Sequence, residues 1–211
     1  MNDAMVKAFE TGRYESSESI ALEKHLRMDD RVLELGAGAG YLTMQIAQRI
    51  GSESLLTVEA NPKMLPVIEN NLVENDITGV TVVNAAVVSD SINSEYITFH
   101  MTAAFWASSL DTALTKKWKS TNSVDVPAVK FSELLQEHQP TVIMMDIEGG
   151  EADLFDAIWP DHIRLLIIEL HPRVYDDAVI KKIFDQMSNS GLTYCPNGSR
   201  GDVVVFKRVC E

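Results

Sequence analysis

The sequence has few cysteines and no long apolar run. Cys195 and Cys210 are its only cysteines, and they form no CxxC pair. We expect both to be free thiols in a reducing compartment, with a disulfide near the C-terminus as the alternative. No apolar run approaches the roughly 18 residues that a membrane helix needs, and the first residues lack the basic and apolar parts of a signal peptide. These absences predict a cytoplasmic protein.

Basic side chains are also scarce. The chain has 18 Lys and Arg residues against 31 Asp and Glu residues, which gives a net charge of −13. Such a surface repels phosphate backbones and anionic membranes, so we expect neither nucleic acid nor membrane as a partner. The hydrophobic content of 45% is typical of a globular protein, and a length of 211 residues suits one domain. We therefore expect a single domain over residues 1–211, and the sequence does not predict its oligomeric state.

Short apolar runs alternate with amphipathic segments along the chain. Strands are expected at 32–35, 55–59, 80–83, 96–101, 126–129, 141–146, 165–170, 192–195 and 203–209. Helices are expected at 16–28, 40–50, 62–74, 132–135, 151–158 and 177–190. This alternation predicts an α/β fold, a Rossmann-like doubly wound sheet of about seven strands that is mostly parallel. The turn at 196–202 favours a C-terminal antiparallel hairpin.

Two segments are expected outside this central sheet. The first is a helical segment within residues 1–30. The second is an insertion on the substrate side at about 96–125, where residues 102–124 are polar and weakly patterned. We interpret residues 102–124 as a substrate-side insertion or a lid.

A glycine-rich turn follows the first expected strand. Residues 31–40 read Arg-Val-Leu-Glu-Leu-Gly-Ala-Gly-Ala-Gly, which places glycines at 36, 38 and 40. Glycines let a ligand approach the backbone closely, and the helix start that follows offers unpaired N–H groups. Glu59 ends the next strand, where an acid can accept hydrogen bonds from both ribose hydroxyls. The pattern predicts a pocket for a nucleoside.

The residues around this turn favour S-adenosylmethionine. Tyr41 stands where the dinucleotide fingerprint needs a third glycine or an alanine, and no Gly-Lys-Ser/Thr follows for a phosphate loop. Glu34 adds negative charge where a pyrophosphate would lie. S-adenosylmethionine instead carries a ribose, an ammonium and a sulfonium. The alternatives are a tight turn in an ordinary α/β domain and a nicotinamide-dependent dehydrogenase.

We expect the cofactor to lie across the carboxyl ends of the strands. The ribose is assigned to Glu59 and the adenine edge to Asn84, and the glycines lie against the methionine portion. Glu34 is expected to brace the glycine turn more than to touch the ligand. The full set of expected cofactor-binding residues is Glu34, Gly36, Ala37, Gly38, Gly40, Glu59, Ala60, Asn61, Asn84, Ala85 and Asp146.

A second dense site follows the fourth parallel strand. Residues 144–151 read Met-Met-Asp-Ile-Glu-Gly-Gly-Glu, and Glu169 and His171 end the next strand. Five groups, namely Asp146, Glu148, Glu151, Glu169 and His171, could line one rim, and carboxylates this close raise one another's pKa.

General-base chemistry is the first interpretation of this rim. His171 or Asp146 would take a proton from an attacking hydroxyl, so the expected catalytic residues are Asp146, Glu148 and His171. A divalent cation that orients the substrate is possible, but the spacing matches no dedicated metal loop, so no metal site is predicted. Alternatively, Glu148 and Glu151 only favour a helix N-terminus, and His171 is a turn residue.

Together these segments resemble a known family. Val-Leu-Glu-Leu-Gly-Ala-Gly-Ala-Gly-Tyr at 32–41, Val-Asn-Ala-Ala-Val at 83–87, Ser-Ser-Leu at 108–110 and Met-Asp-Ile-Glu-Gly-Gly-Glu at 145–151 resemble FkbM-type methyltransferases. The resemblance runs from about residue 20 to 208, and Ala39 departs from the asparagine that is frequent there.

The resemblance implies a class I methyltransferase that uses S-adenosylmethionine. It implies O-methylation of a small molecule such as a sugar, a polyketide or another metabolite. It places cofactor contacts at Gly36, Gly38, Glu59, Asn84 and Asp146, and the active-site rim at Glu148, Glu151 and His171. The alternatives are N-methylation and a non-catalytic module that binds S-adenosylmethionine.

Overall fold

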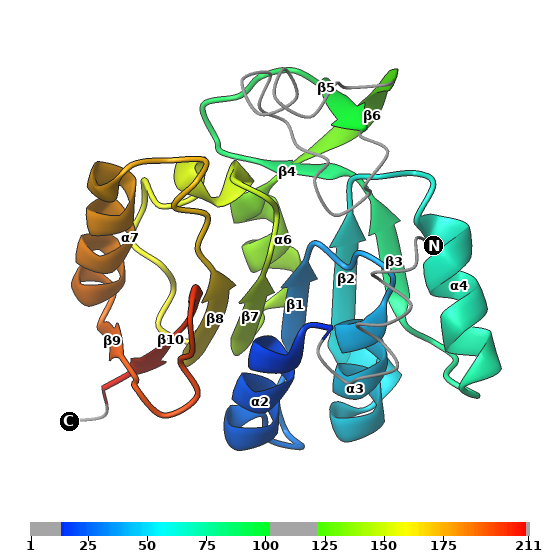
Figure 1. Ribbon diagram of the computed structural model, residues 1–211, viewed down its shortest axis with the longest axis horizontal. Coiled ribbons are helices and arrows are strands. Elements are labelled where there is room, and N and C mark those ends of the chain that lie inside the picture. Colours follow the sequence, from blue (N-terminus) through cyan, green and yellow to red (C-terminus); the bar gives the residue numbers. More distant parts are fainter. Residues whose placement is uncertain (1–13, 102–121, 210–211) are drawn as a thin grey trace.

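The computed structural model of the protein describes residues 14–101 and 122–209 (Figure 1). The first 13 residues of the expected helical segment 1–30, and residues 102–121 of the expected insertion, therefore lie outside the described residues. Within the described ranges, none of the helices is both long and apolar enough to cross a membrane.

The central sheet has seven strands in the order β3-β2-β1-β7-β8-β10-β9. Its strands are β1 (Val32–Leu35), β2 (Leu55–Glu59), β3 (Thr81–Asn84), β7 (Val142–Met145), β8 (Leu165–Glu169), β9 (Leu192–Tyr194) and β10 (Val203–Arg208). Five strands are parallel, and β10 is antiparallel to both of its neighbours. The predicted doubly wound sheet with a C-terminal hairpin is confirmed. The winding reverses between β1 and β7, where ligands bind in such sheets.

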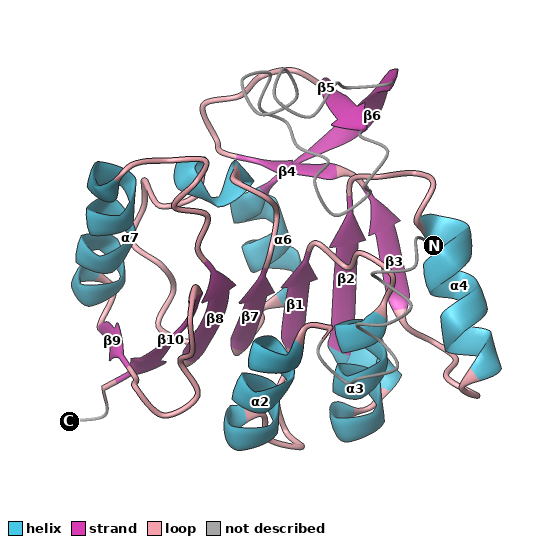
Figure 2. Ribbon diagram, viewed as in Figure 1, coloured by secondary structure: helices cyan, strands magenta, loops and turns pink. Residues whose placement is uncertain are grey.

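Helices cover both faces of this sheet (Figure 2). They are α2 (Ser16–His25), α3 (Tyr41–Ile50), α4 (Leu65–Glu74), α6 (Phe131–His138) and α7 (Asp177–Asn189), with short 3-10 turns η1 (Ser52–Ser54) and η3 (Gly150–Asp153). Alternate residues of β1 face opposite cores. Leu33 and Leu35 pack with residues of α6 and α7, whereas Val32 packs with residues of α2, α3 and α4. Burial on both faces explains why these strands are uniformly apolar.

A smaller sheet of three strands lies beyond the arrowheads of β1, β2 and β3 (Figure 1). Its order is β4 (Ala86–Val88), β6 (Asn122–Lys130) and β5 (Tyr96–Met101). Strand β4 was not predicted, because its three residues follow β3 almost directly. The strand expected at 126–129 begins earlier, so residues 122–124 belong to β6 and not to a lid. Pairing with β5 on one side and β4 on the other extends β6 beyond its apolar part.

Two predicted helix starts are wrong. The helix expected from Pro62 begins at Leu65, and it is Pro66 that lies in its first turn. Residue 62 belongs instead to a turn in which the Asn61 side chain accepts a hydrogen bond from the Lys63 amide, at 3.1 Å. The short helix expected at 132–135 begins one residue earlier and extends to His138 as α6, so Ser132 does not cap it, and its hydroxyl donates to Asp90.

The helix expected at 151–158 is also wrong. Only the 3-10 turn η3 forms there, and an irregular segment follows it. The side chain of Glu151, which could have faced solvent on a helix, is fully buried and accepts a hydrogen bond from the Gly149 amide, at 2.9 Å. Phe155 and Trp159 are buried and stacked at 5.1 Å, so packing takes the place of helical hydrogen bonds in this segment.

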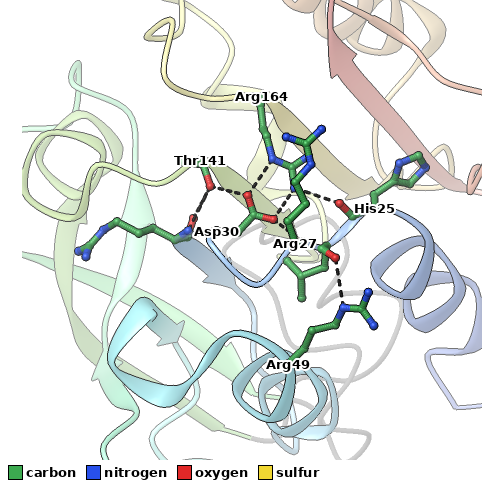
Figure 3. A network of polar contacts seen from close by, with 8 residues as sticks. His25, Arg27, Asp30, Arg49, Thr141 and Arg164 are labelled. Atoms are coloured by element: carbon green, nitrogen blue, oxygen red, sulfur yellow. Dashed lines mark hydrogen bonds and ion pairs between the residues drawn. The ribbon is translucent and has the colours of Figure 1, made fainter.

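A polar network lies where the parallel strands begin, at the end of the sheet away from the glycine-rich turn (Figure 3). Asp30 accepts hydrogen bonds from Arg164 Nε at 2.7 Å and from the Thr141 hydroxyl at 2.8 Å. Arg164 also donates to the His25 carbonyl, at 2.9 Å, and Arg49 donates to the Leu26 carbonyl, at 3.1 Å. We call this set the anchor network. It ties the C-terminal end of α2 to the starts of β7 and β8.

Candidate active site

The glycine loop, residues 36–40, joins β1 to α3. Gly36, Gly38 and Gly40 all have left-handed backbones, with φ of 86°, 52° and 80°. A Cβ atom at Gly36 would lie 1.7 Å from the carbonyl oxygen of Asp146. Only glycine fits there, because the chain leaving β7 crosses directly against the loop. The glycine loop and Asp146 are thus brought together, as predicted.

Glu59 closes the other side of the glycine loop. Its Oε2 accepts from the Gly38 amide at 2.9 Å, and its Oε1 accepts from the Asn61 amide at 2.7 Å. Burial raises the pKa of Glu59, and hydrogen bonds from the amides of Asn61, Gly38 and Ala37 act against that shift. A carboxylate offers about four lone-pair positions, so it can still accept bonds from ribose hydroxyls.

The residues after β2 and β3 support this turn. Asn84 Nδ2 donates to the carbonyls of Glu59 and Ala60, at 2.8 and 3.1 Å. The Ala85 amide donates to the Glu59 carbonyl at 3.2 Å, and the Ala85 side chain is buried in the main core. The side-chain amide of Asn84 therefore supports the turn that carries Glu59. Its contact with the adenine edge stays a prediction.

Glu34 lies beneath the glycine loop. Its side chain is 1% exposed, and its Oε2 accepts from the hydroxyls of Thr43 and Thr57, both at 2.7 Å. Burial raises its pKa to about 7. This carboxylate joins β1, α3 and β2 and has almost no surface to offer a ligand. These bonds agree with the expected bracing role, and a contact of Glu34 with the cofactor stays a prediction.

His171 lies at the centre of the second site, which we call the acidic rim: Asp146, Glu148, Glu151, Glu169 and His171. His171 Nε2 is 3.5 Å from an oxygen of Asp146 and 3.5 Å from an oxygen of Glu148. His171 Nδ1 is hydrogen-bonded to Glu151. The prediction that these groups meet at one edge is confirmed.

Glu151 holds His171 from behind. It accepts a hydrogen bond from the Tyr175 hydroxyl at 3.1 Å, in addition to its bond to the Gly149 amide. The Tyr175 oxygen in turn accepts from the His171 amide, at 2.7 Å. Tyr175 was not predicted, and no motif marks it in the sequence. The interpretation of Glu151 as a helix-capping charge is wrong, because its carboxylate is bonded to an imidazole.

Four groups of the rim have shifted pKa values. Burial raises the pKa of Asp146 and of Glu148 to about 7 and that of Glu169 to about 8, and neighbouring carboxylates add to each shift. Burial lowers the pKa of His171, but the hydrogen bond and charge of Glu151, with Asp146 and Glu148, raise it to about 9. The predicted mutual effect of the carboxylates is confirmed. Near neutral pH the imidazole carries a proton while carboxylates around it exchange theirs.

The backbone at Glu148 is strained. Its φ is 53°, a left-handed conformation that costs an ordinary residue on the order of 1 kcal/mol. The next residue, Gly149, has a φ of 101°, and a Cβ atom there would lie 2.5 Å from Val174 Cγ1. This turn directs Glu148 back toward His171. Strain of this kind is common at functional sites.

Three rim groups are also spaced as metal ligands. One atom from each of Asp146, Glu169 and His171 lies within 4.8 Å of the others. Oxygen and imidazole ligands at such a spacing could hold a divalent ion. The sequence predicts no metal, and that prediction remains untested.

A mostly apolar cavity of about 390 Å³ lies near the rim, and Ser89 and Asp153 are its polar lining residues besides Tyr175. It lies between the small sheet and the turn after β7. Its lining includes Val87, Val88, Ile92, Ile97, Gly149 and Tyr175. Because Tyr175 is bonded to Glu151, this cavity reaches the residues that hold His171.

Solved structures share the fold at low sequence identity. A precorrin-6y C5,15-methyltransferase from Geobacter metallireducens GS-15 is 13% identical, with a TM-score of 0.53 over 92% of this chain and 88% of the other. A magnesium protoporphyrin IX methyltransferase from Synechocystis PCC 6803, solved with bound S-adenosylmethionine, is 12% identical, with a TM-score of 0.51 over 99% of this chain and 86% of the other.

Sequence comparisons identify the family. A curated ribosomal protein L11 methyltransferase from Thermus thermophilus is 39% identical over 72 residues, which are 33% of this chain and 28% of that protein. The family described as Methyltransferase FkbM domain matches residues 34–192, well over half of the chain. The chain therefore belongs to the FkbM methyltransferase family.

Proposed function

We propose that this enzyme methylates a hydroxyl oxygen of a small molecule and that the acidic rim handles the proton. The observation that carries the proposal is the position of His171, between buried Glu151 on one side and Asp146 with Glu148 on the other. Asp146, the member of this cluster that follows β7, has its carbonyl directly against Gly36 of the glycine loop.

The cofactor is assigned to the glycine loop and Glu59. The ribose hydroxyls would bond to the carboxylate of Glu59, and the methionine portion would lie on Gly36 and Gly38. Because the carbonyl of Asp146 packs on Gly36, the sulfonium end would lie beside the rim. This arrangement would present the methyl group to an oxygen held near Asp146 and Glu148.

The rim suits removal of one proton during transfer. With a pKa of about 7, Asp146 or Glu148 is partly ionised at neutral pH and can accept the hydroxyl proton. His171, with a pKa of about 9, stays protonated and stabilises the negative charge that develops on the acceptor oxygen as its proton leaves. S-adenosylmethionine, held by Glu59 and the glycine loop, would supply the methyl group to this oxygen and would release a neutral thioether. Holding oxygen and carbon in line at roughly 3–3.5 Å supplies much of the acceleration.

The cavity beside the rim indicates the kind of acceptor. Its lining by Val87, Val88 and Ile97 suits a largely apolar molecule that carries a hydroxyl. The net charge of −13 disfavours a polyanionic acceptor. Methylation of an amine, on a small molecule or on a protein, is the rival reaction.

The test is a methyl-transfer assay with isotope-labelled S-adenosylmethionine. The panel holds apolar molecules with hydroxyls, matched molecules with amines, and a mixture of peptides, each with and without a chelator. An O-methyl product in the presence of the chelator supports the proposal. Products on nitrogen alone would overturn the hydroxyl assignment, and tight cofactor binding without any product would favour a non-catalytic module. Activity that requires an added divalent ion would replace the proton-transfer role with metal binding.

A further inference from the structure

Two residues that the sequence did not assign to the site lie over the glycine loop. A Cβ atom at Gly38 would be 3.4 Å from the Tyr14 hydroxyl and 3.8 Å from Glu15 Oε1. Both residues come directly before α2, far in sequence from the strand ends that form the rest of the site. They therefore cover the surface on which the methionine portion of the cofactor is expected.

Among the described residues whose charges influence the Glu15 carboxylate, none is positively charged. Its Oε2 is buried and forms no hydrogen bond within the described part of the chain. The charged groups around it are the carboxylates of Asp146, Glu34 and Glu18. Burial raises its pKa well above the usual range, a hydrogen bond with Tyr14 opposes this, and the other carboxylates raise it further. A buried carboxylate among carboxylates is costly unless a cation or donor joins it.

The position of Glu15 is built into the fold. Its φ is 45°, a left-handed conformation, and its carbonyl accepts from the Ser19 amide at 3.0 Å and the Ser19 hydroxyl at 2.8 Å. The ring of Tyr14 packs edge-on against Tyr41, with centroids 5.7 Å apart. The anchor network holds the far end of α2 (Figure 3). The side chain is therefore aimed at the glycine loop from a fixed support.

We propose that Glu15 binds the ammonium group of the methionine portion of S-adenosylmethionine, with Tyr14 orienting its carboxylate. The inference rests on the assigned place of the methionine portion on Gly38. An ammonium offers three donors, and it supplies the positive charge that the group of carboxylates lacks. Charge-assisted hydrogen bonds to a buried carboxylate are strong enough to discriminate between ligands with and without that group.

The test compares two ligands on the intact protein by calorimetry. S-adenosylhomocysteine retains the amino-acid end, whereas 5′-methylthioadenosine lacks it. For Glu15→Gln we expect S-adenosylhomocysteine to bind roughly 10- to 100-fold more weakly, with no change for 5′-methylthioadenosine. Tyr14→Phe should show the same selectivity to a smaller extent. Glu23→Gln is the matched control, because Glu23 is an exposed acid on the same helix.

The outcomes separate this inference from the assigned cofactor site. Equal weakening of both ligands by Glu15→Gln would show a structural role and overturn the proposal, as would unchanged binding of both. If unaltered protein binds neither ligand, the placement of the cofactor on the glycine loop fails as well. Glu15→Asp supplies a second test, since it keeps the charge, and it should restore part of the lost discrimination.

Discussion

Buried carboxylates at the two ends of the parallel strands have pKa values shifted in opposite directions. At the edge where the strands begin, Asp30 is 3% exposed, and bonds from Arg164, Arg27 and Thr141 outweigh burial and lower its pKa. At the edge where the strands end, burial and mutual repulsion raise the pKa of Asp146, Glu148 and Glu169.

The difference separates stability from chemistry within one fold. A carboxylate that is paired with a guanidinium contributes to the free energy of unfolding and remains charged. Carboxylates that crowd one imidazole are held near the point of proton exchange, which is the state that acid–base catalysis and cation binding require. Variants at each edge should therefore fail in different ways.

The largest effect is expected from replacing His171, at the centre of the acidic rim. His171→Gln should lower turnover by about 10²–10⁴-fold, because the charge between Glu151 and Asp146 is lost. Cofactor affinity should change little, since His171 lies outside the glycine loop. Single-turnover kinetics with saturating S-adenosylmethionine measure the first effect, and calorimetry measures the second. A retained rate would make His171 structural.

Breaking the anchor network should affect stability instead. Asp30→Asn leaves Arg164 without its counter-ion and should lower the free energy of unfolding by about 3 kcal/mol at pH 7. Because the folded pKa of Asp30 is lowered, its contribution is present above the unfolded pKa near 3.8 and is lost as the pH falls through the lower folded value. Urea unfolding at pH 7 and pH 3 measures this. A loss at pH 3 as large as that at pH 7 contradicts the assignment.

A smaller effect is expected on cofactor binding. Glu59→Ala should weaken binding of S-adenosylmethionine by roughly 1.5–3 kcal/mol, the value of hydrogen bonds to a charged group. The side chain also holds the Gly38 and Asn61 amides, so Glu59→Gln is a useful companion that keeps part of this support. Calorimetric affinities equal to that of the unaltered protein would remove Glu59 from the ribose site.

The smallest effect sharpens the comparison through pH. Turnover should rise roughly tenfold between pH 6 and pH 8, as a carboxylate of pKa about 7 becomes ionised, and it should fall again as His171 loses its proton near pH 9. Because these groups titrate together, the two limbs belong to the cluster and not to single residues. A flat profile of single-turnover rates from pH 6 to 8 would exclude the carboxylates as the proton acceptor.

The sequence predicted those parts of the molecule that depend on local pattern. The apolar runs at β7 and β8 and the glycines before α3 determine strands and a turn whatever surrounds them. The acidic rim was predictable as well, because residues that follow parallel strands converge at one edge.

Other parts depend on contacts between distant segments. Glu151 was expected to start a helix, yet its side chain is bonded to His171 and it lies in the short turn η3. Tyr175 and Glu15 carry no motif, and only packing brings them to the site. Strand β4 exists because β6 pairs with it.

The close approach of Gly36 to Asp146 has a consequence for engineering. The carbonyl of Asp146 fills the space that a side chain at Gly36 would need. The backbones of the glycine loop and of the turn after β7 are therefore fixed relative to each other. Redesign of acceptor preference should succeed through side chains that line the adjoining cavity, such as Val87 or Ile97. Insertions or deletions in either loop would instead change the spacing between methyl donor and acceptor, so variation in length is the route most apt to abolish transfer altogether.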